Sequence, residues 1–244
     1  MNVNNNTILI TGGSAGIGFE IAKAFAATGN QVIITGRDQT RLNAALKHLP
    51  GTTGIAGDIS KAEDTANLVN TLQKDSPALN IVVNNAGRAH LADLNEGEDL
   101  ASRAEEEMTT NYFSVIRLNE QLLPLLKAQK EAAIINVSSI VAIAPTSVVA
   151  TYSASKAALR SYTHALRISL AKSTVKVFEL MPPLVNTEFS AGIGGSSGIA
   201  PAVVAEELLQ ALAENRYEIR VGDTQQIYDL YLQSPADALM ALNS

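Results

Sequence analysis

The chain has 244 residues, which is long enough for one domain with a large buried core. Its 24 acidic and 18 basic side chains give a formal net charge of -6, which disfavours binding to a nucleic acid backbone. The absence of cysteine excludes disulfides, thiolate catalysis and cysteine-ligated metal. Residues 1–6 lack the order of a signal peptide and no apolar run is long enough to cross a bilayer, so we expect a cytoplasmic protein without a membrane partner.

Seven short apolar runs are predicted to be strands, with helical spacing between most of them. They are Thr7–Thr11, Gln31–Thr35, Thr53–Ala56, Asn80–Val83, Ala132–Val137, Val175–Leu180 and Glu218–Val221. This alternation predicts an α/β fold in which helices cover both faces of a parallel sheet. No repeat or low-complexity linker interrupts the pattern, so we expect a single domain over residues 1–244.

A glycine-spaced turn follows the first predicted strand and leads into a helical stretch. Gly12, Gly16 and Gly18 would let the chain turn tightly, bring backbone N–H groups close to phosphates and let the helix lie near its strand. The turn therefore predicts a seat for the pyrophosphate of a dinucleotide. The glycines alone would also fit an ordinary strand-to-helix loop.

Two further local signals concern a helix start and a loop. Ser60 and Glu63 have the spacing of a capping box, which predicts a helix running to about Lys74. Residues 191–198 are rich in glycine and serine, which are costly to order, so we predict a mobile loop there. Such a loop could be a lid over a bound nucleotide or merely a linker.

Three side chains form a candidate acid/base site. Tyr152 and Lys156 stand four residues apart at the start of a predicted helix, so both project from one face. A free phenol has a pKa of about 10, and a neighbouring ammonium would lower it toward the range useful for proton transfer. Ser139 follows a predicted strand at the carboxyl end, where open α/β sheets place ligands, and its hydroxyl could hold a substrate oxygen.

Together these motifs resemble those of the short-chain dehydrogenase/reductase family, in its short single-domain branch. The resemblance extends from Thr7 to about Val221. The motifs that carry it are Thr11-Gly-x-x-x-Gly-x-Gly18, Asn84-Asn-Ala-Gly87, Asn111, Ser139 and Tyr152-x-x-x-Lys156. The resemblance implies a Rossmann-type doubly wound sheet of about seven strands and an oxidoreductase that transfers hydride.

The resemblance also implies a role for each catalytic residue. Tyr152 would be the general acid/base, and Lys156 would lower its pKa and hold the nicotinamide ribose. Ser139 would orient the carbonyl or hydroxyl of the substrate, and Asn111 would support a water-linked proton relay to Lys156. In this mechanism the hydride comes from the cofactor.

The family's cofactor contacts map onto the glycine turn, the ends of four strands and the catalytic pair. The implied cofactor-binding residues are Gly12, Ser14, Gly16, Ile17, Gly18, Arg37, Asp58, Ile59, Asn85, Ala86, Gly87, Tyr152, Lys156, Pro182, Val185 and Thr187. Asp58 could instead be a loop acid near a helix N-terminus. Pro183 departs from the family's glycine, and proline removes an N–H and fixes φ, which alters the nicotinamide contacts expected there.

The end of the second strand indicates which cofactor is bound. An acid at the position of Gly36 would bind ribose hydroxyls and repel a 2′-phosphate, whereas Arg37 offers a planar cation suited to phosphate. We therefore expect NADP(H) in preference to NAD(H). Ala15 counts against this preference, because many NADP-using relatives carry a basic residue there.

Other segments give weaker signals. The uncharged stretch 140–151 indicates an apolar pocket wall or packing in the core. The acid-rich residues 93–107 are interpreted as a solvated loop and helix start, and we predict no metal site. His48, His90 and His164 are interpreted as surface or packing residues.

Two apolar stretches bear on assembly. The helix that carries the tyrosine continues through Leu159, Tyr162, Leu166 and Leu170, and a last helical stretch covers Gln225–Leu242 with an interruption at Pro235. Family members are commonly dimers or tetramers, so we expect a homodimer or homotetramer. Packing within one subunit would explain the same residues.

The expected activity is reduction of a carbonyl, or oxidation of the matching alcohol, on a small organic molecule. The alternative is a catalytically silent regulatory protein that senses NADP(H), which would not need the intact Ser139, Tyr152 and Lys156. A third interpretation, a reductase of substrates tethered to a carrier protein, would require a basic docking patch that the acidic charge balance does not indicate.

Overall fold

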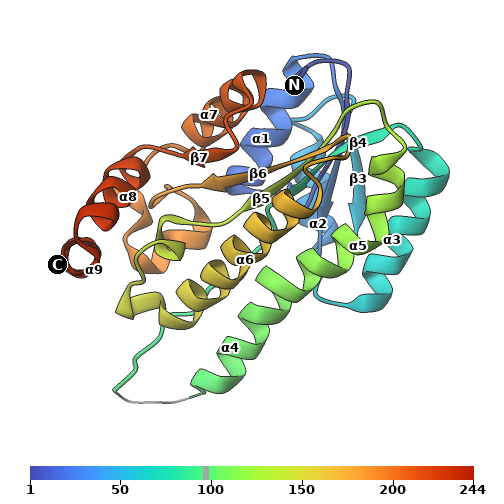
Figure 1. Ribbon diagram of the computed structural model, residues 1–244. Coiled ribbons are helices and arrows are strands. Elements are labelled where there is room, and N and C mark those ends of the chain that lie inside the picture. Colours follow the sequence, from blue (N-terminus) through green and yellow to red (C-terminus); the bar gives the residue numbers. More distant parts are fainter. Residues whose placement is uncertain (96–98) are drawn as a thin grey trace.

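The computed structural model describes residues 1–95 and 99–244, in which seven parallel strands form one sheet (Figure 1). Their order is β3-β2-β1-β4-β5-β6-β7. The strands are β1 (Thr7–Ile10), β2 (Gln31–Gly36), β3 (Thr53–Ala56), β4 (Leu79–Asn84), β5 (Ala132–Val137), β6 (Val175–Met181) and β7 (Glu218–Arg220). The seven predicted strands are confirmed, each with its ends within one residue of the structure.

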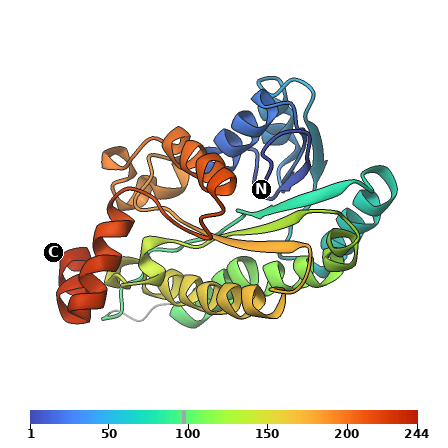
Figure 2. The ribbon, with the colours of Figure 1, turned by 45° about the horizontal axis from the view of Figure 1, so that its top comes forward.

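Helices cover both faces of this sheet, which gives the Rossmann-type fold expected from the resemblance (Figure 2). The α-helices are α1 (Gly16–Ala27), α2 (Gln39–Leu46), α3 (Ala62–Asp75), α4 (Leu100–Met108), α5 (Ser114–Lys127), α6 (Ala150–Ser169), α7 (Pro201–Glu214), α8 (Asp223–Gln233) and α9 (Pro235–Asn243). Thr109–Phe113 forms a π-helical turn (η1), and 3-10 helices cover Ile140–Ala142 (η2), Ser147–Val149 (η3), Glu188–Ile193 (η4) and Gly195–Ser197 (η5).

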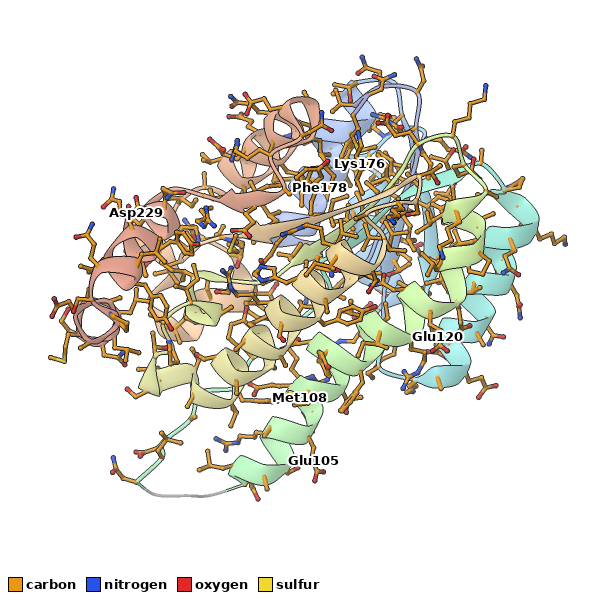
Figure 3. All side chains as sticks on the ribbon, viewed as in Figure 1. Glu105, Met108, Glu120, Lys176, Phe178 and Asp229 are labelled. Carbon is orange, nitrogen blue, oxygen red and sulfur yellow. The ribbon has the colours of Figure 1, made fainter. Side chains whose placement is uncertain are left out.

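The core is divided between the two faces of the sheet. Ile8 and Ile10 of β1 pack in the cluster that includes α1, α2 and α7, whereas Leu9 between them packs in the cluster with α3 and α5. Phe178 of β6 is fully buried near the middle of the molecule, while Asp229 of α8 lies at its periphery (Figure 3). No helix within the described ranges is both long and apolar enough to cross a membrane.

The strand order places a binding crevice at the carboxyl ends of β1 and β4. From β1 the chain first builds β2 and β3 on one side and then crosses to build β4 to β7 on the other. The connections therefore leave β1 and β4 in opposite directions, which opens a crevice between their carboxyl ends. The glycine turn follows β1, and the Asn84–Gly87 segment follows β4.

Helix starts follow local capping, with one correction. The Oδ1 of Asp38 accepts hydrogen bonds from the backbone N–H groups of Thr40 and Arg41, which begins α2. The capping box predicted from Ser60 and Glu63 is wrong, because α3 begins one residue later than that box requires. The hydroxyl of Ser60 instead donates to Oδ1 of Asp58 at 2.7 Å.

The segment 191–198 is folded into 3-10 turns, where the sequence predicted a mobile loop. It completes η4 and contains η5, and Gly195 is buried against Ser190. Next to it, Val185 and Ile199 form an isolated parallel bridge. A lid motion of this segment stays a prediction.

Some of the apolar residues in the stretches proposed for assembly are buried within the subunit, and others are exposed. Leu159 and Leu170 are buried in this single chain, while Ile168 of α6, Leu232 of α8 and Met240 of α9 are exposed. The predicted interruption of the last helix at Pro235 is confirmed, because α8 ends at Gln233 and α9 begins at Pro235. The homo-oligomer itself stays a prediction.

The tight packing of the glycine turn generates a test of stability. A Cβ on Gly18 would lie 2.4 Å from the carbonyl oxygen of Gly12 and from Nδ2 of Asn85. We expect Gly18→Ala to lower the free energy of unfolding by about 2 kcal/mol or more, because backbone atoms must move. Urea unfolding measures it. The control Gly57→Ala, whose Cβ would have its nearest contact at 3.6 Å, should change stability by less than about 0.5 kcal/mol; equal losses in the two variants would contradict the argument.

Candidate active site

A cavity of about 1090 Å³ lies along the carboxyl ends of the strands. It runs from the glycine turn after β1 to the C-terminal helices α8 and α9. The residues predicted to bind cofactor all line it except Gly18, which lies beneath the turn against Asn85. Ser139 also lines the cavity, whereas Asn111 does not.

The glycine turn is tied to the segment after β4 by a small hydrogen-bond network. Oγ1 of Thr11 accepts from the backbone N–H groups of Asn85 and Ala86, both at 3.0 Å. The side chain of Asn85 donates back to the carbonyl oxygens of Thr11 and Gly12. These hydrogen bonds join the segments at the carboxyl ends of β1 and β4 to each other.

The geometry of the glycine turn fits the pyrophosphate of a dinucleotide. Gly12 and Gly16 have φ of +65° and +55°, a conformation that glycine adopts at little cost. Helix α1 begins at Gly16, so its unpaired N–H groups and the positive end of its dipole face the turn. A Cβ on Gly16 would meet Thr187 at 3.2 Å, so the segment after β6 bounds the cavity opposite the turn.

Two arginines lie where β2 ends, together with the acids Asp38 and Asp58. Arg37 and Arg41 both line the cavity there, and no acid stands at Gly36. Arg41 also pairs with Glu188 of η4, with Nη2 and Oε2 2.6 Å apart. Sequence reasoning missed this pair, because Arg41 and Glu188 are far apart in the chain and belong to no motif.

Asp58 lies at the same end of the cavity. Burial raises its pKa, but hydrogen bonds from Ser60 and the charge of Arg37 outweigh burial and hold the pKa below its usual value. The Asp58 carboxylate therefore stays ionised beside the arginine. This arrangement is compatible with the predicted adenine contact.

Ser139 and Tyr152 face the cavity from two adjoining elements. Ser139 follows β5 and caps η2, with Oγ accepting from the N–H of Val141 at 3.3 Å. Tyr152 stands in the first turn of α6. Burial raises the pKa of Tyr152 above that of a free phenol, and a hydrogen bond with Ser139 lowers it in part.

Lys156 lies one helical turn after Tyr152, as the spacing predicted. Its Nζ is 5.5 Å from the centre of the tyrosine ring and donates to the carbonyl oxygen of Val137 at 2.8 Å. Burial lowers the pKa of Lys156 to about 8. The lowering of the tyrosine pKa by Lys156 stays a prediction.

Asn111 is fully buried and stands in a π-helical turn between α4 and α5. Its Nδ2 donates to Oγ of Ser155 and to the carbonyl of Arg88, and its Oδ1 accepts from the N–H of Arg88. The hydroxyl of Ser155 in turn donates to the carbonyl of Tyr152. Asn111 therefore connects the segment after β4 to α6, while its part in a proton relay to Lys156 stays a prediction.

One acid of the stretch interpreted as solvated is wholly buried instead. Glu107 of α4 is 0 % exposed, and its Oε1 accepts from the N–H of His90 at 2.6 Å. Its charge helps to raise the pKa of Tyr152. Residues 96–98 of the same stretch lie outside the described residues.

A second buried acid contacts Ser138, the residue that precedes Ser139. Glu179 of β6 accepts from the hydroxyl of Ser138 at 2.6 Å, and its other oxygen lies 3.2 Å from Arg160 and 3.1 Å from His164 of α6. Burial raises the pKa of Glu179, but the contacts with His164, Arg160 and Ser138 outweigh it and keep the pKa below its usual value. His164 is thus a packing residue, and the cluster links α6 to the ends of β5 and β6.

Comparison with known proteins decides the family. A family model described as short chain dehydrogenase matches residues 6–198, and "Uncharacterized oxidoreductase DltE" of Bacillus subtilis is 36% identical over 224 residues, which cover 90% of this chain and 89% of that protein. The chain belongs to the short-chain dehydrogenase/reductase family.

Solved structures of other short-chain dehydrogenases have the same fold. One from Burkholderia cenocepacia in complex with NADP has a TM-score of 0.89 and 26% sequence identity, and each chain covers 100% of the other. One from Burkholderia phymatum in complex with NAD also has a TM-score of 0.89, with coverage of 100% and 97%. At 19% identity the latter shows the fold alone.

The burial of Lys156 generates a prediction in which stability and activity move in opposite directions. Because burial lowers its pKa from 10.5 to about 8, holding the ammonium in the fold costs about 3 kcal/mol at pH 7. Lys156→Met removes this cost and loses one hydrogen bond of about 1 kcal/mol, so the variant should be about 1–2 kcal/mol more stable at pH 7 and inactive.

Urea unfolding at several pH values measures this difference. Below pH 8 Lys156 is protonated in both the folded and the unfolded wild-type protein, so the full cost of burying its charge is present. Between about pH 8 and 10.5 Lys156 loses its proton in the folded protein but keeps it in the unfolded chain, so the wild type regains stability. The advantage of the variant should therefore shrink above pH 8. Lys74→Met on the exposed surface of α3 should show no such trend, and a Lys156 variant that is less stable at pH 7 would refute the argument.

Proposed function

We propose that this short-chain dehydrogenase/reductase uses NADPH to reduce the carbonyl group of a small organic molecule, or oxidises the matching alcohol. The observation that carries the proposal is the meeting of Ser139, Tyr152 and Lys156 on one cavity with the glycine turn. The cavity therefore places the phenol of Tyr152, the hydroxyl of Ser139 and the buried ammonium of Lys156 near the proposed pyrophosphate-binding turn. This combination suits reduction of a polarised C=O group.

The side chains divide the proton chemistry among them. Tyr152 donates its hydroxyl proton to the substrate oxygen, and Ser139 holds the same oxygen with a hydrogen bond. Lys156, one turn along α6, stabilises the tyrosinate that remains. In the direction of oxidation the tyrosinate takes the proton back from the alcohol. The bound dinucleotide supplies or accepts the hydride.

The cavity lining supports a particular placement of cofactor contacts. The N-terminus of α1 with Gly12 and Gly16 would hold the pyrophosphate, and Asp58 would lie near the adenine. Pro182, Val185 and Thr187, together with Lys156, would hold the nicotinamide end. The carbonyl of Pro182 accepts from the N–H of Ile140, which keeps this segment next to the serine.

The preference for NADP(H) rests on the charges at the end of β2. Arg37 and Arg41 lie there without a carboxylate at Gly36, which favours a 2′-phosphate over free ribose hydroxyls. The two solved relatives are described with NADP and with NAD, so both cofactors occur on this fold. NAD(H) is the second option for this chain.

We also propose that the enzyme works in the cytoplasm as a homodimer or homotetramer. The absence of cysteine is compatible with a reducing compartment. The exposed Ile168, Leu232 and Met240 supply apolar surface that a second subunit could cover.

The central test is Tyr152→Phe, which removes only the phenolic hydroxyl. We expect turnover of a panel of aldehydes, ketones, quinones and sugars to fall by at least about 100-fold, because general acid catalysis contributes that much, while NADPH binding persists. Stopped-flow absorbance of NADPH measures both. Tight NADPH binding without turnover in the wild type would instead support the regulatory alternative, in which Tyr152→Phe changes nothing.

The cofactor preference has its own test in Arg37→Ala. Loss of one charge-assisted contact to phosphate should weaken NADPH binding roughly 10- to 100-fold and leave NADH binding nearly unchanged. Fluorescence titration gives both dissociation constants. Arg216→Ala, which removes a similar charge away from the cavity, controls for net charge; equal losses for the two cofactors with Arg37→Ala would sink the assignment.

A further inference from the structure

The cavity is charged at one end and apolar at the other. The lining cations and acids Arg37, Asp38, Arg41, Asp58 and Glu188 gather where β2 and β3 end or pair with that cluster. Beyond the catalytic tyrosine most of the lining side chains are apolar, namely Val141, Val148, Leu184, Ile193, Ile227 and Leu242, with Thr146 and Gln226 as uncharged polar ones. Among the described residues, the charged side chain that lines this far end is Asp223, at the start of α8.

Two large apolar side chains lie half-exposed next to the reacting groups. Phe189 of η4 has its ring centre 5.9 Å from that of Tyr152, and Val148 of η3 stands four residues before the same tyrosine. Each has a relative exposure of 52%, and both line the cavity. Exposed apolar surface beside an acid/base is stabilised when an apolar ligand covers it.

The last helix lines the far end of the cavity. Ala241 and Leu242 of α9 line the cavity, and Asn243 next to them is anchored to the segment before α6. Oδ1 of Asn243 accepts from the N–H of Ser147 at 2.9 Å, and Nδ2 donates to the carbonyl of Pro145 at 3.0 Å. The wall made by α9 is therefore fixed relative to Val148.

We infer that the substrate of this site is an uncharged carbonyl compound with an apolar body, which lies between Phe189 and Val148 and ends against Leu242. The inference rests on the proposed function and names its substrate class. An anionic body would lie among apolar side chains and near the carboxylate of Asp223, without a cation beyond Lys156 to neutralise it. A longer apolar body would cover more of the wall until it reaches α9.

The first experiment compares methyl ketones and aliphatic aldehydes of increasing chain length with NADPH. We expect kcat/KM to rise by roughly fourfold for each added methylene, because each buries apolar surface, and then to level off or fall. Matched compounds that end in a carboxylate group should react at least tenfold more slowly. A flat dependence on length, or a preference for a charged end, would overturn the inference.

Three variants test where in the cavity the apolar body of the substrate lies. Phe189→Ala should flatten the length dependence, raising KM for long substrates more than it changes kcat. Leu242→Ala should move the optimum to longer chains, since the end wall recedes. Val203→Ala, at an apolar surface residue of α7 that is 41% exposed and away from the cavity, should leave the profile unchanged. A profile that Phe189→Ala and Leu242→Ala leave unaltered would contradict the placement of the substrate.

A binding measurement separates this inference from the proposed activity. The Tyr152→Phe protein saturated with NADPH can be titrated with the same ketones by calorimetry, independently of turnover. If the wild type reduces nothing but this protein binds longer ketones more tightly, the activity fails and the substrate class stands. If the wild type reduces only short or charged carbonyl compounds and long ketones do not bind, the activity stands and the substrate class is wrong.

Discussion

Buried amide hydrogen bonds hold α6, the helix of Tyr152 and Lys156, on the sheet, and the geometry of the candidate site depends on them. Nδ2 of Asn84 at the end of β4 donates to Oδ1 of Asn136 in β5, at 2.8 Å, and to Oδ1 of Asn119 in α5. Nδ2 of Asn136 donates onward to Thr163 of α6 at 2.9 Å. A buried amide that lost its partner would cost about 1–3 kcal/mol, so this chain of bonds fixes the register of α6. Tyr152 is thereby held opposite the end of β5, where Ser139 stands.

The same region contains groups that work against folding. Lys156 and Glu107 are buried ionisable side chains, and one oxygen of Glu107 has no hydrogen-bond partner. Removing charge from water is unfavourable unless partners compensate, as Ser138 and Arg160 do for Glu179. The hydrogen bonds of Asn84 and Asn136 and the apolar packing of α6 contribute stability that offsets the cost of these buried charges.

The sequence predicted the strands of the sheet and the helical spacing of Tyr152 and Lys156 well, because these signals are local. Strand ends follow from short apolar runs, and Tyr152 and Lys156 share a face because of the helical period. The sequence could not predict features that need the packed fold. Glu107 was interpreted as solvated because its neighbours in the chain are acidic, yet the π-turn and the loop at His90 enclose it. The pair of Arg41 and Glu188 joins residues 147 positions apart, which no local pattern reveals.

The division of the cavity into two ends follows the order of the chain. The charged end is built by segments that follow β2 and β3 early in the chain, within the range that the family model matches. The apolar end needs α8 and α9, and Ile227 and Leu242 lie beyond residue 198, where that match stops. The residues proposed to bind the cofactor therefore lie within the range that the family model matches. The wall that would select the substrate comes in part from residues outside it, so changes there can alter specificity without disturbing Ser139, Tyr152 and Lys156.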